Sequence, residues 1–149
     1  MVASMTTPIP PRPLAHSTGF LLAWVAATAQ KRYEEAIGRV GLTAHEVGTL
    51  TLVAAQPQPQ ARLAEHLGLF SAHIVRVVES LEQRGLVGRS PVPGDRRASA
   101  IHATASGEEA LAQAEAAGTA ATDEILGVLG RADLAQLDRI LRRLAGIDE

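Results

Sequence analysis

Two arginine-containing segments of the chain carry side chains suited to binding the phosphates and base edges of a nucleic acid. One is segment 71–76, with the sequence Ser-Ala-His-Ile-Val-Arg, and the other is Asp95-Arg96-Arg97. A guanidinium is a planar set of donors that matches phosphate oxygens and the two acceptors on the major-groove edge of guanine. An apolar side chain such as Val75 suits the methyl group of thymine. The chemistry that these residues predict is noncovalent recognition of double-stranded DNA.

The distribution of charge along the chain agrees with a directed anionic partner. The chain of 149 residues has a formal net charge of −2. Residues 72–97 contain five arginines and three acidic residues, a local charge of +2, whereas residues 104–130 contain five acidic residues and no lysine or arginine. A weakly acidic chain with one basic segment favours a specific contact over nonspecific coating of a polyanion.

Patterns typical of catalysis or of a metal centre are missing from the sequence. The adjacent acid and imidazole pairs are His45-Glu46 and Glu65-His66, and a zinc-protease motif would need a histidine at Thr49. Cysteine is absent. The five histidines have no common ligand spacing: His16, His45, His66, His73 and His102. We therefore expect neither an enzyme nor a cofactor, although a metal site of histidine and glutamate stays an alternative.

Segment 71–76 opens a predicted helix that runs from Ser71 to Arg84. One face of this helix is apolar at i, i+3, i+4 and i+7: Ile74, Val77, Val78 and Leu81. If the amino-terminal half enters a major groove, it presents five residues there: Ser71, Ala72, His73, Val75 and Arg76. The alternative is that Arg76 only pairs with Glu79 on a solvated surface.

A β-hairpin with an arginine-bearing tip is predicted directly after this helix. Its parts are Gly85 as the helix stop, Leu86, Val87 and Arg89 as the start of a strand, Pro91 to Gly94 as the turn, and Ala98 to Ala103 as the second strand. One guanidinium of Arg96 and Arg97 can enter a narrow minor groove while Asp95 orients its neighbour. With two short helices before it, the hairpin completes a winged helix-turn-helix.

The upstream sequence predicts the helices that support the helix from Ser71 to Arg84, which we call the recognition helix. One long amphipathic helix is expected from Leu14 to about Gly38, closed by Gly41 in the left-handed conformation. Thr43 and Glu46 form a capping box for a second helix, which ends at Gln56-Pro57-Gln58-Pro59. A third, short helix with Leu63, Ala64 and Leu67 is broken by Gly68.

The downstream sequence predicts two further helices, from Thr104 to about Val128 and from Arg131 to Gly146. We expect residues 14–37 and 123–147 to form an intertwined homodimer interface. The predicted organisation is a disordered leader at 1–13, a helical dimerisation region at 14–42 and 104–149, and a winged helix-turn-helix lobe at 43–103. The fold class is mainly α with a small β-hairpin wing. Apolar stretches are too short for a bilayer span, so we expect a cytoplasmic protein with no membrane partner.

The joint spacing of these segments resembles the MarR family of winged-helix transcriptional regulators. The matching segments are Gly41-Leu42-Thr43, Leu63-Ala64-Glu65, Leu67-Gly68, Arg76 through Arg89, Asp95-Arg96-Arg97, and Thr104 with Gly107. The resemblance implies that Arg97 enters the minor groove with Asp95 as its partner in the wing, and that Ser71 to Arg76 reads bases and touches phosphates. With Arg89 and Arg96, these residues are the predicted DNA-binding set.

Four positions depart from the usual pattern of the family. Phe70 stands where a capping serine is common, so the helix starts at Ser71 or Phe70 packs into the core. Ala72 and Val75 replace polar residues, and Ala103 replaces a large apolar residue. The first three substitutions leave open a protein-interaction module with little DNA affinity. The resemblance also leaves open a metal-responsive regulator, with a site of histidine and glutamate across the dimer.

The resemblance implies a homodimeric repressor that binds a pseudo-palindromic operator and competes with polymerase until a small-molecule effector releases it. Trp24, Tyr33 and His45 are the candidate effector-binding residues, in a crevice between the dimer helices and the winged lobes. The alternative for Trp24 is ordinary packing in the core or the dimer interface.

Overall fold

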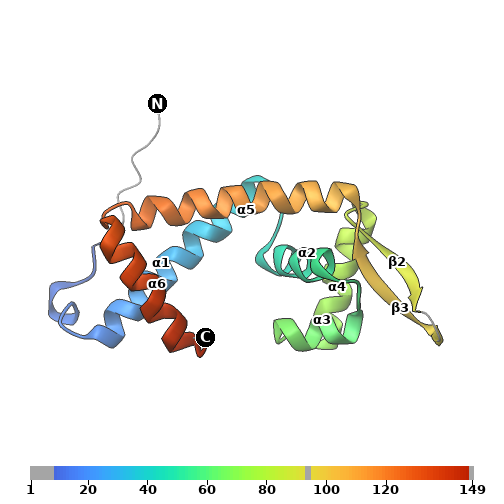
Figure 1. Ribbon diagram of the computed structural model, residues 1–149, viewed down its shortest axis with the longest axis horizontal. Helices are drawn as coiled ribbons and strands as arrows, with labels where there is room; N and C mark the ends of the chain where they lie inside the picture. Colours follow the sequence, from blue (N-terminus) through green and yellow to red (C-terminus); the bar gives the residue numbers. More distant parts are fainter. Residues whose placement is uncertain (1–8, 93–94, 148–149) are drawn as a thin grey trace. The chain divides into compact units, whose positions relative to one another are not determined.

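A computed structural model describes residues 9–92 and 95–147, and the description of side chains leaves out 92–98 (Figure 1). Its helices are the 3₁₀ turn η1 (Arg12–Leu14) and the α-helices α1 (Thr18–Arg39), α2 (Ala44–Ala55), α3 (Gln60–Leu67), α4 (Ser71–Gln83), α5 (Ala105–Leu126) and α6 (Arg131–Ala145). Its strands are β1 (Gln58–Pro59), β2 (Val87–Val92) and β3 (Asp95–Ala103). The prediction of a mainly helical fold with a small β wing is confirmed.

The chain divides into two compact units. Unit 1 comprises Met1–Arg32 and Thr119–Glu149, and unit 2 comprises Tyr33–Gly118. Helices α1 and α5 contribute to both units, so the division falls within helices, whereas the predicted organisation changes at 42/43 and 103/104. Most of the predicted leader, residues 1–8, lies outside the described residues.

Unit 2 holds one hydrophobic core, to which α2, α3, α4 and β3 each contribute fully buried side chains. The apolar face predicted for α4 is confirmed, because Ile74, Val77, Val78 and Leu81 are all buried. They pack in one cluster with Leu50 of α2, Leu63 of α3 and Ile101 of β3. Burial of each large aliphatic side chain contributes about 1.5–3 kcal/mol. This packing fixes which face of α4 points away from the core.

The sheet has three strands where the sequence predicts two. Its order is β1-β3-β2, and all pairs are antiparallel. Gln58 and Pro59, which were expected only to end α2, pair with Ile101 and Ala100. A proline lacks an N–H but is tolerated at a sheet edge, where β1 lies. The returning strand β3 begins at Asp95 instead of Ala98, and Asp95 pairs with Val92.

The predicted ends of the helices agree closely with the observed ones in unit 2. Gly41 has a φ of 79°, which confirms its predicted left-handed conformation after α1. Gly68 and Gly85, predicted as helix stops, are left-handed as well, with φ of 62° and 69°. Gly107 has a different role, because a Cβ there would overlap the carbonyl oxygen of Leu86. The absence of a side chain lets α5 begin directly against the start of the wing.

Unit 1 contains the first part of α1, the last part of α5 and all of α6. Helix α1 begins at Thr18 instead of Leu14, because η1 and a turn precede it and Ser17 Oγ accepts a hydrogen bond from the amide of Phe20 at 3.3 Å. Arg32 Nη1 and Glu124 Oε2 lie 3.4 Å apart and join α1 to α5 in this unit. Among the described residues, no helix combines the length and hydrophobicity that a membrane span requires.

Candidate nucleic-acid interface

The amino-terminal half of α4 is exposed on the side that faces away from the core. All five residues predicted to meet a major groove are exposed: Ser71, Ala72, His73, Val75 and Arg76. Within the described part of the chain Arg76 forms no ion pair, so the alternative of an Arg76–Glu79 pair is not what the structure shows. The Arg76 guanidinium is therefore available for an external anion.

Phe70 precedes α4 at the position that normally caps a helix. It has an extended backbone with φ −66° and ψ 146°, makes no side-chain hydrogen bond to the helix, and is 88% exposed. Of the two sequence-based alternatives, a helix start at Ser71 is confirmed and packing of Phe70 into the core is wrong. A residue without a capping side chain costs a helix about 0.5–2 kcal/mol relative to serine or aspartate.

His73 contacts a residue that sequence analysis assigned to a different site. The rings of His45 and His73 meet edge to face, with centroids 4.7 Å apart and an interplanar angle of 80°. His45 is a predicted effector-binding residue, and in the structure it lies beside the recognition helix, α4. Both histidines are exposed.

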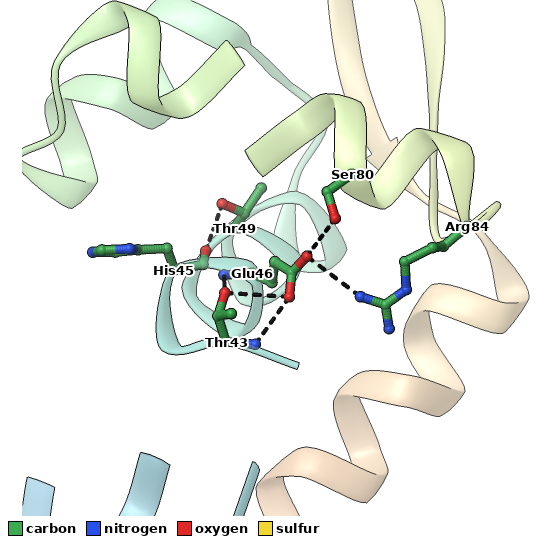
Figure 2. A network of polar contacts seen from close by, with 6 residues as sticks. All are labelled: Thr43, His45, Glu46, Thr49, Ser80 and Arg84. Atoms are coloured by element: carbon green, nitrogen blue, oxygen red, sulfur yellow. Dashed lines mark hydrogen bonds and ion pairs between the residues drawn. The ribbon is translucent and has the colours of Figure 1, made fainter. Parts of the chain in front are cut away.

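A buried carboxylate holds the other half of α4 on α2. Figure 2 shows Glu46 between Thr43 on one side and Ser80 and Arg84 on the other. Glu46 Oε2 accepts hydrogen bonds from the Thr43 amide at 2.9 Å and hydroxyl at 3.2 Å, while Glu46 N donates to Thr43 Oγ1 at 3.3 Å. The predicted capping box is thus confirmed.

The second oxygen of Glu46 makes contacts that sequence analysis missed. Glu46 Oε1 accepts hydrogen bonds from Ser80 Oγ at 2.7 Å and from Arg84 Nη1 at 3.3 Å. Glu46 is only 6% exposed, so these partners offset the cost of burying its charge. No local pattern could reveal them, because Ser80 and Arg84 are far from Glu46 in sequence. The network fixes the carboxyl-terminal half of α4 relative to α2.

Arg89, a predicted DNA-binding residue, makes internal contacts in this structure. Its Nε and Nη2 donate to the two carboxylate oxygens of Glu82 at 2.8 and 2.9 Å, and its Nη1 donates to Gln60 Oε1 at 3.4 Å. The hydrogen bonds to Glu82 raise the pKa of Arg89, with the charges of Glu82 and Glu79 adding to the effect. This guanidinium therefore ties β2 to the end of α4.

The tip residues Asp95, Arg96 and Arg97 are the first three residues of β3, in the hairpin that follows α4. Their side chains fall outside the described part of the structure. Their predicted roles in the wing accordingly stay predictions.

The candidate effector-binding residues occur in separate settings. Trp24 belongs to unit 1, where its ring lies 5.7 Å from that of Phe20. Tyr33 belongs to unit 2, beside Gly118, and burial followed by the charge of Glu115 raises the pKa of its phenol. Among the described residues, no group of three or more His, Cys, Asp or Glu side chains is placed to hold a metal ion.

Known proteins are similar to this chain in both sequence and fold. The sequence profile of the MarR family matches residues 42–99. A putative transcriptional regulatory protein for the hcr operon of Thauera aromatica is 32% identical over 133 residues, which are 88% of this chain and 80% of the relative.

Two solved structures are similar along almost their whole length. A MarR-family transcriptional regulator from Rhodococcus sp. RHA1 has a TM-score of 0.73 and 30% identity, covering 89% of this chain and 94% of the other. CouR from Rhodococcus jostii RHA1, solved with p-coumaroyl-CoA bound, has a TM-score of 0.71 and 30% identity with the same coverage.

These similarities connect the exposed half of α4 and the β wing to an established class of DNA-binding regulators, which are not enzymes. The chain belongs to the MarR family of winged helix-turn-helix transcriptional regulators.

Proposed function

We propose that the protein is a homodimeric repressor that binds a pseudo-palindromic operator and is released by a small-molecule effector. The observation that carries this proposal is the exposure of residues 71–73 and 75–76 on a helix whose opposite face is buried. A helix anchored in this way can enter a major groove without disturbing the core.

The proposed contacts follow from the position of each element. Ser71 to Arg76 meets base edges and phosphates in the major groove, with Arg76 on guanine. Arg97, oriented by Asp95, enters the minor groove beside it, and Arg96 contacts phosphate. Arg89 contributes mainly by holding the wing on Glu82, at 2.8 Å.

Homodimerisation is supported by the apolar side chains that unit 1 leaves exposed. Leu22 and Val25 of α1 are 54% and 50% exposed, and Ile140, Leu141 and Leu144 of α6 are 44%, 47% and 70% exposed. A second copy of this surface would cover these side chains. Two-fold symmetry then places two recognition helices about 34–36 Å apart, which is the length of one turn of DNA.

An effector is supported by the solved relative that holds p-coumaroyl-CoA. Two conformations of the dimer differ in the spacing of their recognition helices, and only one of them fits DNA. A ligand releases DNA only if it binds the conformation that does not fit DNA more tightly than the one that does. Trp24, Tyr33 and His45 stay the candidate residues for such a ligand. A cytoplasmic location follows from the proposed action on promoter DNA.

Selection of duplexes from a random library by the purified protein tests the proposal. We expect an inverted repeat with half-site centres about 10 base pairs apart. Light scattering after size exclusion should report a dimer at micromolar concentration. A monomer, or selected sequences without a repeat, would contradict the homodimeric operator complex.

A further inference from the structure

The amino-terminal end of α4 carries three exposed apolar residues, which we call the apolar patch: Phe70, Ala72 and Val75. Phe70 is 88% exposed and Val75 is 36% exposed, and Ala72 is also exposed. An exposed phenyl ring contributes nothing to the core. Phe70 also leaves the first turn of α4 without a side-chain cap. Folding therefore gives no reason for phenylalanine at this position, and locally unfavourable residues of this kind occur where function requires them.

Few hydrogen-bonding groups accompany the apolar patch. Of the three polar residues in the same half of the helix, His73 has its ring against His45 at a centroid distance of 4.7 Å. Ser71 and Arg76 then remain as the side chains most able to bind base edges. Direct readout of the major groove needs either hydrogen bonds or an apolar contact to the C5-methyl group of thymine. The composition of this surface favours the second means at several positions.

We propose that Phe70, Ala72 and Val75 recognise thymine methyl groups in each operator half-site and so determine specificity. The inference rests on the proposed DNA-binding function and names the bases that this surface selects. The exposed Arg76 lies on the same helix as the patch. Its positive charge suits duplex DNA better than the apolar surface of a partner protein.

Replacement of single thymines by deoxyuridine in the selected operator tests the proposal with the wild-type protein. Deoxyuridine keeps the base pair and removes only the methyl group. At one or more positions in each half-site, we expect the Kd to rise about fourfold for each methyl removed. At the same position, a 5-methylcytosine–guanine pair should bind more tightly than an unmethylated cytosine–guanine pair.

Two variants connect the methyl effect to the patch. For Phe70→Ser and Val75→Ala, the ratio of Kd between deoxyuridine and thymine duplexes should fall towards one at the positions that each residue faces. Phe70→Ser should also raise the Tm, because serine can cap α4. Ile9→Ser is the matched control, since Ile9 is 83% exposed but lies before η1. It should leave the ratio unchanged.

The possible failures are distinguishable. If no duplex is retained at low salt, the proposed function fails and this inference fails with it. If duplexes are retained but deoxyuridine has no effect at any position, thymine-methyl recognition by the patch is wrong while DNA binding stands. The same holds if both variants show the same Kd ratio between deoxyuridine and thymine duplexes as the wild type. Half-sites selected without thymine would also overturn it.

Discussion

The two halves of α4 use their side chains in opposite ways. In the amino-terminal half, Arg76 is exposed and has no ion pair among the described residues. In the carboxyl-terminal half, Glu82 is bound to Arg89 at 2.8 Å, and Arg84, which directly follows the helix, is bound to Glu46 at 3.3 Å. One helix thus combines an anchored end with an end that is open to a partner.

The difference shows why charge alone does not locate the interface. Arg76, Arg84 and Arg89 lie within a short basic segment, and sequence analysis placed Arg89 with Arg76 in the DNA-binding set. In the structure, Arg89 has a bidentate carboxylate partner, whereas Arg76 has none among the described residues. Substitutions at the anchored end should therefore lower stability, and those at the open end should lower affinity.

The largest expected effect is on stability, from removal of the Glu46 carboxylate. Glu46→Ala leaves Ser80, Arg84 and the amide of Thr43 without their acceptor, and we expect a loss of about 2–3 kcal/mol in the free energy of unfolding. Urea denaturation followed by circular dichroism measures it. Glu46→Gln keeps some of these hydrogen bonds and should lose less. A Glu46→Ala protein as stable as the wild type would remove the anchor from the account.

Gly107→Ala should also lower the stability of the anchored end. The new methyl group would overlap the carbonyl oxygen of Leu86, which follows α4. We expect a loss of about 1–3 kcal/mol in the free energy of unfolding, as in other overpacked sites. Gly68→Ala is the comparison variant, because a Cβ at Gly68 would meet no other atom. Any loss of stability there would come from the positive φ of Gly68 and not from a steric overlap. Unchanged denaturation of Gly107→Ala would show that α5 begins with more room than the structure indicates.

Arg76→Ala should reverse the pattern. Because Arg76 is exposed and unpaired among the described residues, the free energy of unfolding should change by less than about 0.5 kcal/mol. Operator affinity should fall about tenfold, with preference relaxed at particular base pairs. Fluorescence anisotropy with the selected operator and single-base variants measures both effects. Arg12→Ala removes the same charge before α1 and serves as the control; an equal loss with both variants would indicate only net charge.

Arg89→Ala should have the smallest effect. Its side chain and that of Glu82 are 39% and 31% exposed, so solvent screens the ion pair and we expect a loss of about 0.5 kcal/mol in stability. Base preference should not change. If Arg89→Ala relaxed base preference as strongly as Arg76→Ala, the assignment of Arg89 to the anchored end would be wrong.

Local patterns were sufficient for most of the fold. The buried face of α4 follows from helical spacing, and the Thr43–Glu46 capping box follows from two residues three positions apart. Such features depend on neighbours in the sequence, so periodicity and capping rules predict them.

Features that join distant residues were not predictable in the same way. The pairing of Gln58 with Ile101 adds a third strand that no local rule indicates. The link from Glu46 to Ser80 likewise appears only once α2 and α4 have packed, and the pairing of Arg89 with Glu82 only once β2 lies against the end of α4. The DNA-binding set taken from the sequence stays a prediction, and the difference between the exposed Arg76 and the paired Arg89 needed the tertiary structure.

The salt dependence of operator affinity tests the central claim most directly. If the open end of α4 and the arginines of the wing bind DNA as a dimer, log Kd should rise linearly with log salt, with a slope of about 4 or more from the phosphate contacts of two copies. Arg96→Ala, which removes a proposed phosphate contact in each copy, should reduce that slope by about 1 per contact removed. Affinity that barely responds to salt, or no retention of the selected duplex even at low salt, would contradict the account.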